Sequence, residues 1–162
     1  MTVLGSSVVW ASAAGQQRDW IATRIPHQGL MCLLDNVVLA SAQEMVCTSS
    51  SHRSPHNPMR VDGMLGAACG IEYAAQAMAL HGALIAEIKG TDRSSKGFLV
   101  NVRNVSLHVD RLDDLSEDLT VSARCEADNG DHCVYEFKLS AAERVLIQGR
   151  AMVMLNASTP TV

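Results

Sequence analysis

The stretch from Gly63 to Ala86 constrains the fold of this chain more than any other part of the sequence. It reads GMLGAACGIEYAAQAMALHGALIA, and Glu72 carries its only formal charge. Because alanine, glycine, leucine, methionine and isoleucine surround this acid, we expect most of the stretch to be buried. Residues at spacings of three and four share one face of a helix, and the face of Glu72 also carries Ala68, Ala75, Gln76 and Ala79. The sequence therefore predicts one long central helix with a single acid on it.

Glu72 has two interpretations. A carboxylate in an apolar, close-packed wall tends to have a raised pKa, which suits a proton-transfer group. The alternative is a core helix whose one acid pairs with a backbone group or with Gln76, since structural networks also perturb pKa values. The small side chains beside Glu72 would let a ligand or another backbone approach closely. The helix alone leaves both interpretations open.

Two features raise the question of a membrane. The 63–86 stretch is long enough for a span, but Glu72, Gln76, His81 and many small residues favour a helix inside a soluble domain. The N-terminal residues MTVLGSSVVWASAAG resemble a secretory signal. They lack its basic region, and serines break their short apolar run. Residues 1–16 are therefore predicted to be a flexible lead-in.

Composition and charge predict one globular domain. The chain has 162 residues, 48% of them hydrophobic and 19% charged, which is enough for a real core. A net charge of −4, with few aromatic residues and no run of lysine or arginine, argues against nucleic-acid binding. The five cysteines are odd in number and lack CxxC spacing, which argues against disulfides or a zinc site and favours a reducing cytoplasm. Cys69 is close to Glu72, but no sequence partner marks it as a nucleophile.

The remaining chain predicts strands on both sides of the central helix. Residues 17–23 have a short helical pattern, and strand-like runs follow at 30–40, 45–52, 97–109, 119–127, 132–139 and 145–155. A single apolar helix must lie against such a sheet, and the strands must curl around it. We therefore predict an α+β fold, an antiparallel sheet wrapped around one helix, over residues 17–156, with a loose tail at 157–162.

Four segments carry a resemblance to a known family. They are IPHQGLMCLLDNVV (25–38), GIEYAAQA (70–77), the strand and acidic turn of 97–121, and the closing strand pair of 132–155. In this order they resemble the hotdog-fold 3-hydroxyacyl-acyl-carrier-protein dehydratases, over about residues 17–156. The run PHNPMRVDGMLGAACGIEYAAQA is more similar to small dehydratases of aryl-polyene-type pathways than to the housekeeping enzymes.

The resemblance implies an enzyme that dehydrates a 3-hydroxyacyl thioester to the enoyl thioester, in fatty-acid or polyene-like biosynthesis. In the family, a histidine from the loop before the helix removes the proton alpha to the carbonyl. An acid on the partner subunit's helix protonates the departing hydroxyl, and a backbone N–H at the helix N-terminus polarises the carbonyl. The acid maps onto Glu72. The family's usual histidine position is Pro58 here, so the nearest histidine, His56, is the predicted base.

Further residues receive roles through the same resemblance. The predicted substrate-binding residues are Gly66, Gly70, Asn57 and Gln76, with the glycines allowing close packing and Asn57 holding the His56 ring or a carbonyl. His27, in the matching PH motif, is predicted to be structural. His81, His108 and His132 are left unassigned. The predicted contacts with the substrate's carrier are Arg53, Arg60, Arg103 and Arg111.

The resemblance also implies partners and alternatives. We expect a homodimer with edge strands paired across the interface, a substrate on acyl carrier protein or coenzyme A that brings its own phosphopantetheine, and no metal or redox cofactor. One alternative is a hotdog thioesterase, in which the helix acid directs water at the carbonyl. The other is a non-catalytic acyl-thioester-binding partner subunit. Whether His56 points across the dimer interface at Glu72 would separate dehydration from both.

Overall fold

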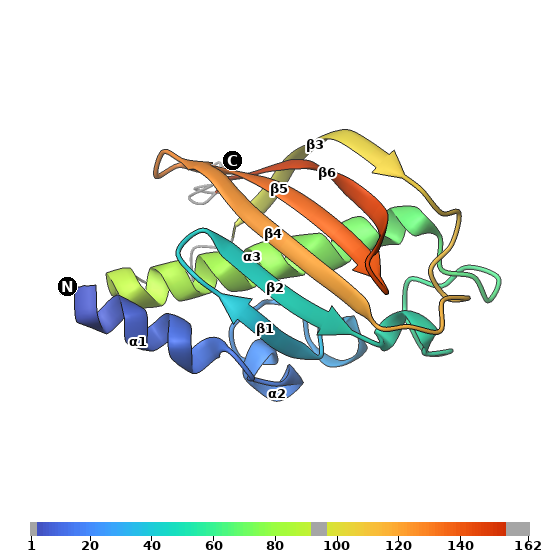
Figure 1. Ribbon diagram of the computed structural model, residues 1–162, viewed down its shortest axis with the longest axis horizontal. Coiled ribbons are helices and arrows are strands. Elements are labelled where there is room, and N and C mark those ends of the chain that lie inside the picture. The colour runs from blue at the N-terminus through green and yellow to red at the C-terminus, as the bar shows by residue number, and fades with distance from the viewer. Residues whose placement is uncertain (1–2, 92–96, 155–162) are drawn as a thin grey trace, which may run out of the picture.

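A computed structural model describes residues 3–91 and 97–154 (Figure 1). Its helices are α1 (Val3–Ala13), α2 (Arg18–Ala22) and α3 (Gly70–Lys89). Its strands are β1 (Asn36–Ala40), β2 (Glu44–Ser49), β3 (Phe98–Leu107), β4 (Leu119–Asp128), β5 (His132–Ala141) and β6 (Arg144–Met154). Short 3-10 turns occupy Gly29–Met31, Ser51–Arg53 and Ala67–Cys69.

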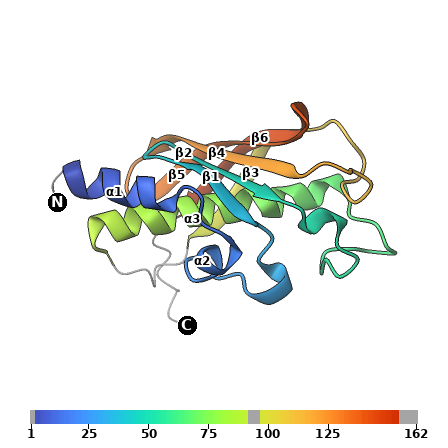
Figure 2. The ribbon, with the colours of Figure 1, turned by 60° about the horizontal axis from the view of Figure 1, so that its bottom comes forward.

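The strands form one antiparallel sheet around a single long helix. Their order is β1-β2-β4-β5-β6-β3, and every neighbouring pair is antiparallel. Figure 2 shows α3 running along one face of this sheet, with α1 beside it. The predicted α+β fold, an antiparallel sheet wrapped around one long helix, is confirmed. None of the helices in the described part of the chain is long and apolar enough to cross a membrane.

The central helix is shorter than the apolar stretch that predicts it, and its C-terminal end has a local cause. Gly90 follows its last residue in the left-handed conformation, at φ 67°, which ends the helix because glycine adopts this conformation without strain. At the other end, Gly70 packs directly on the sheet. A Cβ there would overlap the Cδ1 atom of Ile147 and lie 3.0 Å from Cδ2 of Leu139. The predicted role of Gly70 in close packing therefore fits the structure.

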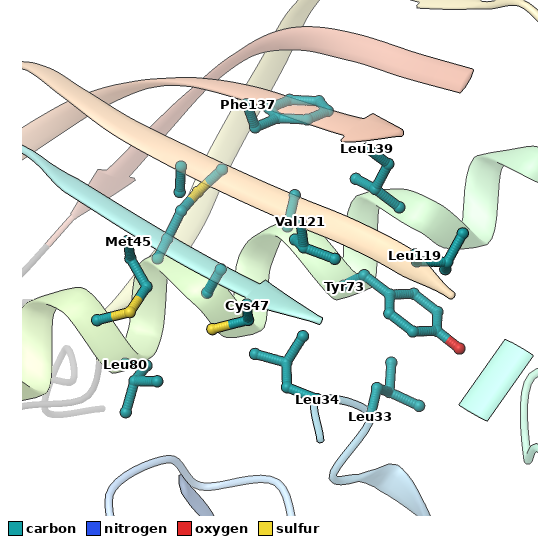
Figure 3. Close-up of a cluster of buried hydrophobic side chains, with 14 of the residues drawn as sticks. Leu33, Leu34, Met45, Cys47, Tyr73, Leu80, Leu119, Val121, Phe137 and Leu139 are labelled. Atoms are coloured by element: carbon teal, nitrogen blue, oxygen red, sulfur yellow. The ribbon is translucent and has the colours of Figure 1, made fainter. Parts of the chain in front are cut away.

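The core lies between α3 and the face of the sheet that it covers. Buried side chains alternate along the strands, as Leu119, Val121 and Ala123 do on β4. Figure 3 shows this layer meeting α3 and the irregular segment before β1; it labels Leu33, Leu34, Met45, Cys47, Tyr73, Leu80, Leu119, Val121, Phe137 and Leu139. Alternation on the strands and a three-to-four spacing on the helix are the two patterns from which the fold was predicted.

The N-terminal residues differ from the predicted flexible lead-in, because residues 3–13 form the helix α1. The ring of Trp10 stacks on the ring of His81 on α3, with centroids 5.5 Å apart, and Ala13 is fully buried. Beyond the helix, the N–H of Gly15 donates to the Val37 carbonyl of β1 at 2.8 Å. These contacts join segments that are far apart in sequence, so no local sequence pattern could predict them. The predicted tail at 157–162 lies outside the described residues.

The predicted strand at 30–40 is a strand only over β1. The preceding residues, Cys32, Leu33 and Leu34, are buried in an irregular segment. Side chains satisfy its backbone in place of a neighbouring strand: the Leu33 N–H donates to Oε1 of Gln76, and the Leu33 carbonyl accepts from the hydroxyls of Ser49 and Ser51. Apolar content predicted burial here, but not the irregular path that brings this segment against α3.

Candidate active site

Glu72 lies in the first turn of α3 and is partly exposed, with 32% of its side chain accessible. Its Oε1 atom accepts two hydrogen bonds, from Nε2 of His27 at 2.9 Å and from Nε2 of Gln76 at 3.2 Å. Within the described residues, its Oε2 atom has no hydrogen-bond partner. One carboxylate oxygen is thus held by protein groups, and the other is available to a ligand.

His27 reaches this carboxylate from the segment between α2 and the 3-10 turn Gly29–Met31. The Ile25 side chain is buried just before it, and the Gln28 side chain donates to the carbonyl of Ala22, so the segment is fixed on both sides of the ring. The Nδ1 atom of His27 is buried and has no partner among the described residues. An ionised carboxylate has no hydrogen to give, so Nε2 carries the proton of this hydrogen bond.

Gln76 lies one turn after Glu72 and is fully buried. Its Nε2 donates to the carbonyl of Met31 at 2.7 Å as well as to Glu72, and its Oε1 accepts the N–H of Leu33 at 2.9 Å. Gln76 therefore binds residues 31–33 to α3 and donates one N–H to the carboxylate of Glu72. The sequence predicted a substrate contact for Gln76, whereas every hydrogen bond described for this side chain goes to another part of the protein.

The pKa of Glu72 is lowered from its ordinary value, where the sequence predicted a raised one. The hydrogen bond from His27 is the largest cause, and the Gln76 bond and the charge of His27 act in the same direction. Burial raises the pKa, but less than these contacts lower it. The expectation of a raised pKa was therefore wrong, because it counted the apolar helix around Glu72 and not the donors that the fold brings to it. Glu72 is a carboxylate at neutral pH.

His56 lies on the loop before α3, and its side chain is exposed. Its backbone N–H donates to Oγ of Ser54 at 3.2 Å. The loop folds around Arg60, whose guanidinium donates to the carbonyls of Ser54 at 2.8 Å and Gly63 at 2.6 Å, and to two carbonyls at positions 52 and 53. In this single chain His27, and not His56, is the histidine bonded to Glu72. The role of His56 as a base acting across an interface stays a prediction.

The other predicted substrate-binding residues organise the entrance to α3. Asn57 is buried and donates at 3.1 Å both to the Ser51 carbonyl and to the Tyr73 hydroxyl. These partners belong to the protein itself, so the predicted contact of Asn57 with substrate stays a prediction. Gly66 is exposed, and a Cβ there would meet nothing within 4 Å, so close packing does not demand glycine at this position.

Three of the four arginines predicted to contact a carrier are engaged within the chain. Arg53 pairs with Asp118 at 2.6 Å, Arg60 is held in its loop, and Arg111 pairs with Asp113. Asp113 also accepts the N–H of Leu65 at 2.8 Å, so that pair fixes the approach to α3. Arg103 is exposed on β3. The sequence signalled a positive charge at these positions but could not show which charges were already paired.

His81 and the cysteines have structural surroundings. His81 is fully buried, with Nε2 2.9 Å from the Ser41 carbonyl and Nδ1 2.8 Å from the Tyr135 hydroxyl, and burial lowers its pKa. The five cysteines are free thiols, and burial raises the pKa of Cys47 and of Cys133 to about 12. Cys69 places its Sγ 4.0 Å from the Met59 carbonyl. Neither group of side chains adds a reactive centre beside Glu72.

The family comparison decides the class of this site. The family model described as ApeP dehydratase matches residues 20–161, nearly the whole chain. The chain belongs to the ApeP-like dehydratase family. The resemblance and the enzyme class predicted from the sequence are confirmed. No curated protein matches the sequence.

Solved structures place the ApeP-like chain among hotdog proteins. The dehydratase heterocomplex ApeI:P from Xenorhabdus doucetiae matches with a TM-score of 0.76 and 22% identity, over 86% of this chain and 92% of the other. Thioesterase superfamily member 2 from Mus musculus matches with a TM-score of 0.60 and 11% identity, over 96% and 100%. A putative thioesterase from Shewanella oneidensis has a TM-score of 0.60 and 9% identity, over 93% and 98%. At these identities the likeness shows the fold, which hosts more than one activity.

Proposed function

We propose that this ApeP-like protein removes water from a 3-hydroxyacyl thioester, linked to acyl carrier protein or coenzyme A, and forms the enoyl thioester. The observation that carries the proposal is the partly exposed carboxylate of Glu72, which two N–H groups hold at the start of the central helix. Its lowered pKa keeps it able to accept a proton at neutral pH. Elimination next to a thioester carbonyl needs such an acceptor at the C2 proton.

The proposed step balances with proton transfers alone. It gives Glu72 the proton removal that the family resemblance assigns to His56, because Glu72 is ionised at neutral pH and His27 is the histidine bonded to it. Oε2 of Glu72 takes the C2 proton, the electrons of that bond form the C2=C3 double bond, and the C3–O bond breaks. The departing hydroxyl takes up a proton and leaves as water, and returning the C2 proton to it restores the carboxylate. A backbone N–H near the start of α3 is the proposed donor to the thioester oxygen, where negative charge develops. At Gly70 itself, backbone N–H groups already donate to the carbonyls of Ala67 and Ala68. The scheme uses no metal or redox cofactor.

A second hotdog subunit is part of the proposal. Strand β3 lies at the edge of the sheet and exposes Phe98, Leu99, Val100, Val105 and Leu107, each at least 37% accessible. A long apolar edge strand that stays unpaired invites aggregation, so a partner strand is expected to cover it. We propose the homodimer expected from the sequence. The match to a dehydratase heterocomplex makes a different hotdog chain the alternative partner.

The test is the dehydration of 3-hydroxyacyl thioesters by purified protein, followed as formation of the enoyl thioester. E72Q keeps the size of the side chain and removes the proton acceptor, so we expect a loss of about 10²- to 10⁴-fold. Release of free thiol from the same substrates measures thioester hydrolysis in parallel. Undiminished dehydration by E72Q, or thiol release without enoyl product in the wild type, would contradict the proposal.

We propose that the enzyme acts in the reducing cytoplasm, because its five cysteine side chains are free thiols.

A further inference from the structure

We infer that His27 is a positioning residue for this dehydration: its Nε2–H fixes the Glu72 carboxylate as the proton acceptor, so that one carboxylate can both remove the C2 proton and return it to the leaving hydroxyl. The inference rests on the proposed function and adds a residue to it. The sequence offered His27 only as a structural histidine, 45 positions before Glu72.

The first support is a continuous row of hydrogen bonds within one chain. Gln76 uses both amide hydrogens, one on the Met31 carbonyl and one on Oε1 of Glu72. His27 donates to the same oxygen from the other segment. Two donors on Oε1 fix the plane of the carboxylate and leave Oε2 as its open oxygen. A group that removes a proton from carbon benefits from such fixed geometry, because the reacting atoms must meet at about 3–3.5 Å.

The second support is the direction in which His27 faces. Its Nδ1 atom is buried without a partner, while Nε2 is occupied by Glu72. Nδ1 is therefore enclosed by the protein, and Nε2 is taken up by Glu72. A histidine in this orientation has no free nitrogen for the substrate, so its effect on the reaction passes through the carboxylate.

The third support comes from the charged and titratable groups around Glu72. Among those of the described residues, His27 is the one that changes the pKa of Glu72. Cys69, in the 3-10 turn that precedes α3, lies three residues before Glu72, and Gln76 on α3 is neutral. On the facing segment, Arg24 is directed to Glu87 of α3, at 3.4 Å, and not to Glu72. The hydrogen bond from His27 is the largest cause of the lowered pKa of Glu72, and no other charged side chain contributes to it. Removing the ring should therefore change the protonation of Glu72 as well as its orientation.

The experiment compares the pH dependence of kcat/KM for wild type, H27Q, H27L and H108Q in the dehydration assay. Glutamine can place an N–H where Nε2 of histidine lies, whereas leucine cannot donate. We expect H27L to move the acidic limb upward by about one pH unit, with about a tenfold loss on that limb that recovers at higher pH. H27Q should stay within about threefold of wild type. His108 is exposed on the surface, and H108Q is the matched control.

Several outcomes would overturn the inference. If H27Q lost as much activity as H27L with no shift of the limb, His27 would itself transfer the proton or serve only the fold. A loss for H56Q as large as that of E72Q would assign the second transfer to the loop histidine. Nitrogen NMR tests the geometry on the wild-type protein and so does not depend on whether a variant folds. Nε2 of His27 must carry a proton that is hydrogen-bonded to a carboxylate, and an unprotonated Nε2 would refute the geometry. Undiminished activity of E72Q would instead refute the proposed function.

Discussion

Replacing Gln76 by glutamate tests the arrangement around Glu72 most directly. The change preserves the shape of the side chain but replaces its NH2 group by a second carboxylate oxygen. That oxygen would lie 2.7 Å from the Met31 carbonyl and 3.2 Å from Oε1 of Glu72, the distances now spanned by hydrogen bonds. The acceptor of the Leu33 N–H remains. Two favourable contacts therefore become repulsive, and a third is unchanged.

The magnitude follows from the distance between the two carboxylates. Two unit charges 3.2 Å apart repel by about 5 kcal/mol at an effective dielectric constant of 20. The folded protein avoids this by keeping one proton on the pair, which costs about 1.4 kcal/mol for each pH unit above the ordinary glutamate value of about 4.3. The expected loss of stability is thus about 1 kcal/mol at pH 5 and about 5 kcal/mol at pH 8. The sign is that of a raised pKa in the folded state, so stability is lost as the pH rises.

The assay is urea unfolding of Q76E, of Q76L and of the wild type at pH 5 and pH 8. Q76L leaves the Leu33 N–H and the Met31 carbonyl without partners, and we expect it to cost about 2–5 kcal/mol at both pH values. The pH dependence should appear in Q76E alone, as about 4 kcal/mol between the two conditions. A Q76E protein as stable at pH 8 as at pH 5, relative to wild type, would refute the contact between Gln76 and Glu72.

Two further predictions concern the helix and the edge strand. G70A should lower the free energy of unfolding by about 1–2 kcal/mol, because overlap with Ile147 outweighs the gain in helix propensity; equal or greater stability in urea would contradict the packing of α3 on the sheet. V100K puts a charge on the exposed apolar edge strand β3 and should convert the proposed dimer to a monomer, as measured by light scattering after size exclusion. K138A changes an exposed position on β5 and, as the control, should leave the assembly unchanged. A V100K dimer would place the interface elsewhere.

The site shows how far local patterns reach. Glu72 stood out because it is the only charge in the apolar stretch 63–86, and Asn57 because it precedes that stretch in a loop rich in turn residues. His27 carried no such signal, since the PH motif is separated from Glu72 by two strands and a loop. The direction of the Glu72 pKa was missed for the same reason. An apolar neighbourhood is visible in the sequence, but the donor that outweighs it comes from another segment.

The sequence by itself determined the fold class, the central helix, the alternating strands and the acid at the start of the helix. These follow from periodicity and composition within short windows, where each residue's neighbours are its neighbours in the chain. Only the tertiary structure decided that α1 packs on α3, that residues 32–34 run irregularly, and that His27 and Gln76 hold Glu72 as a carboxylate. Each of these depends on which distant segments touch. Which distant segments touch is set by the packing of the whole core, and no single stretch of sequence encodes these contacts.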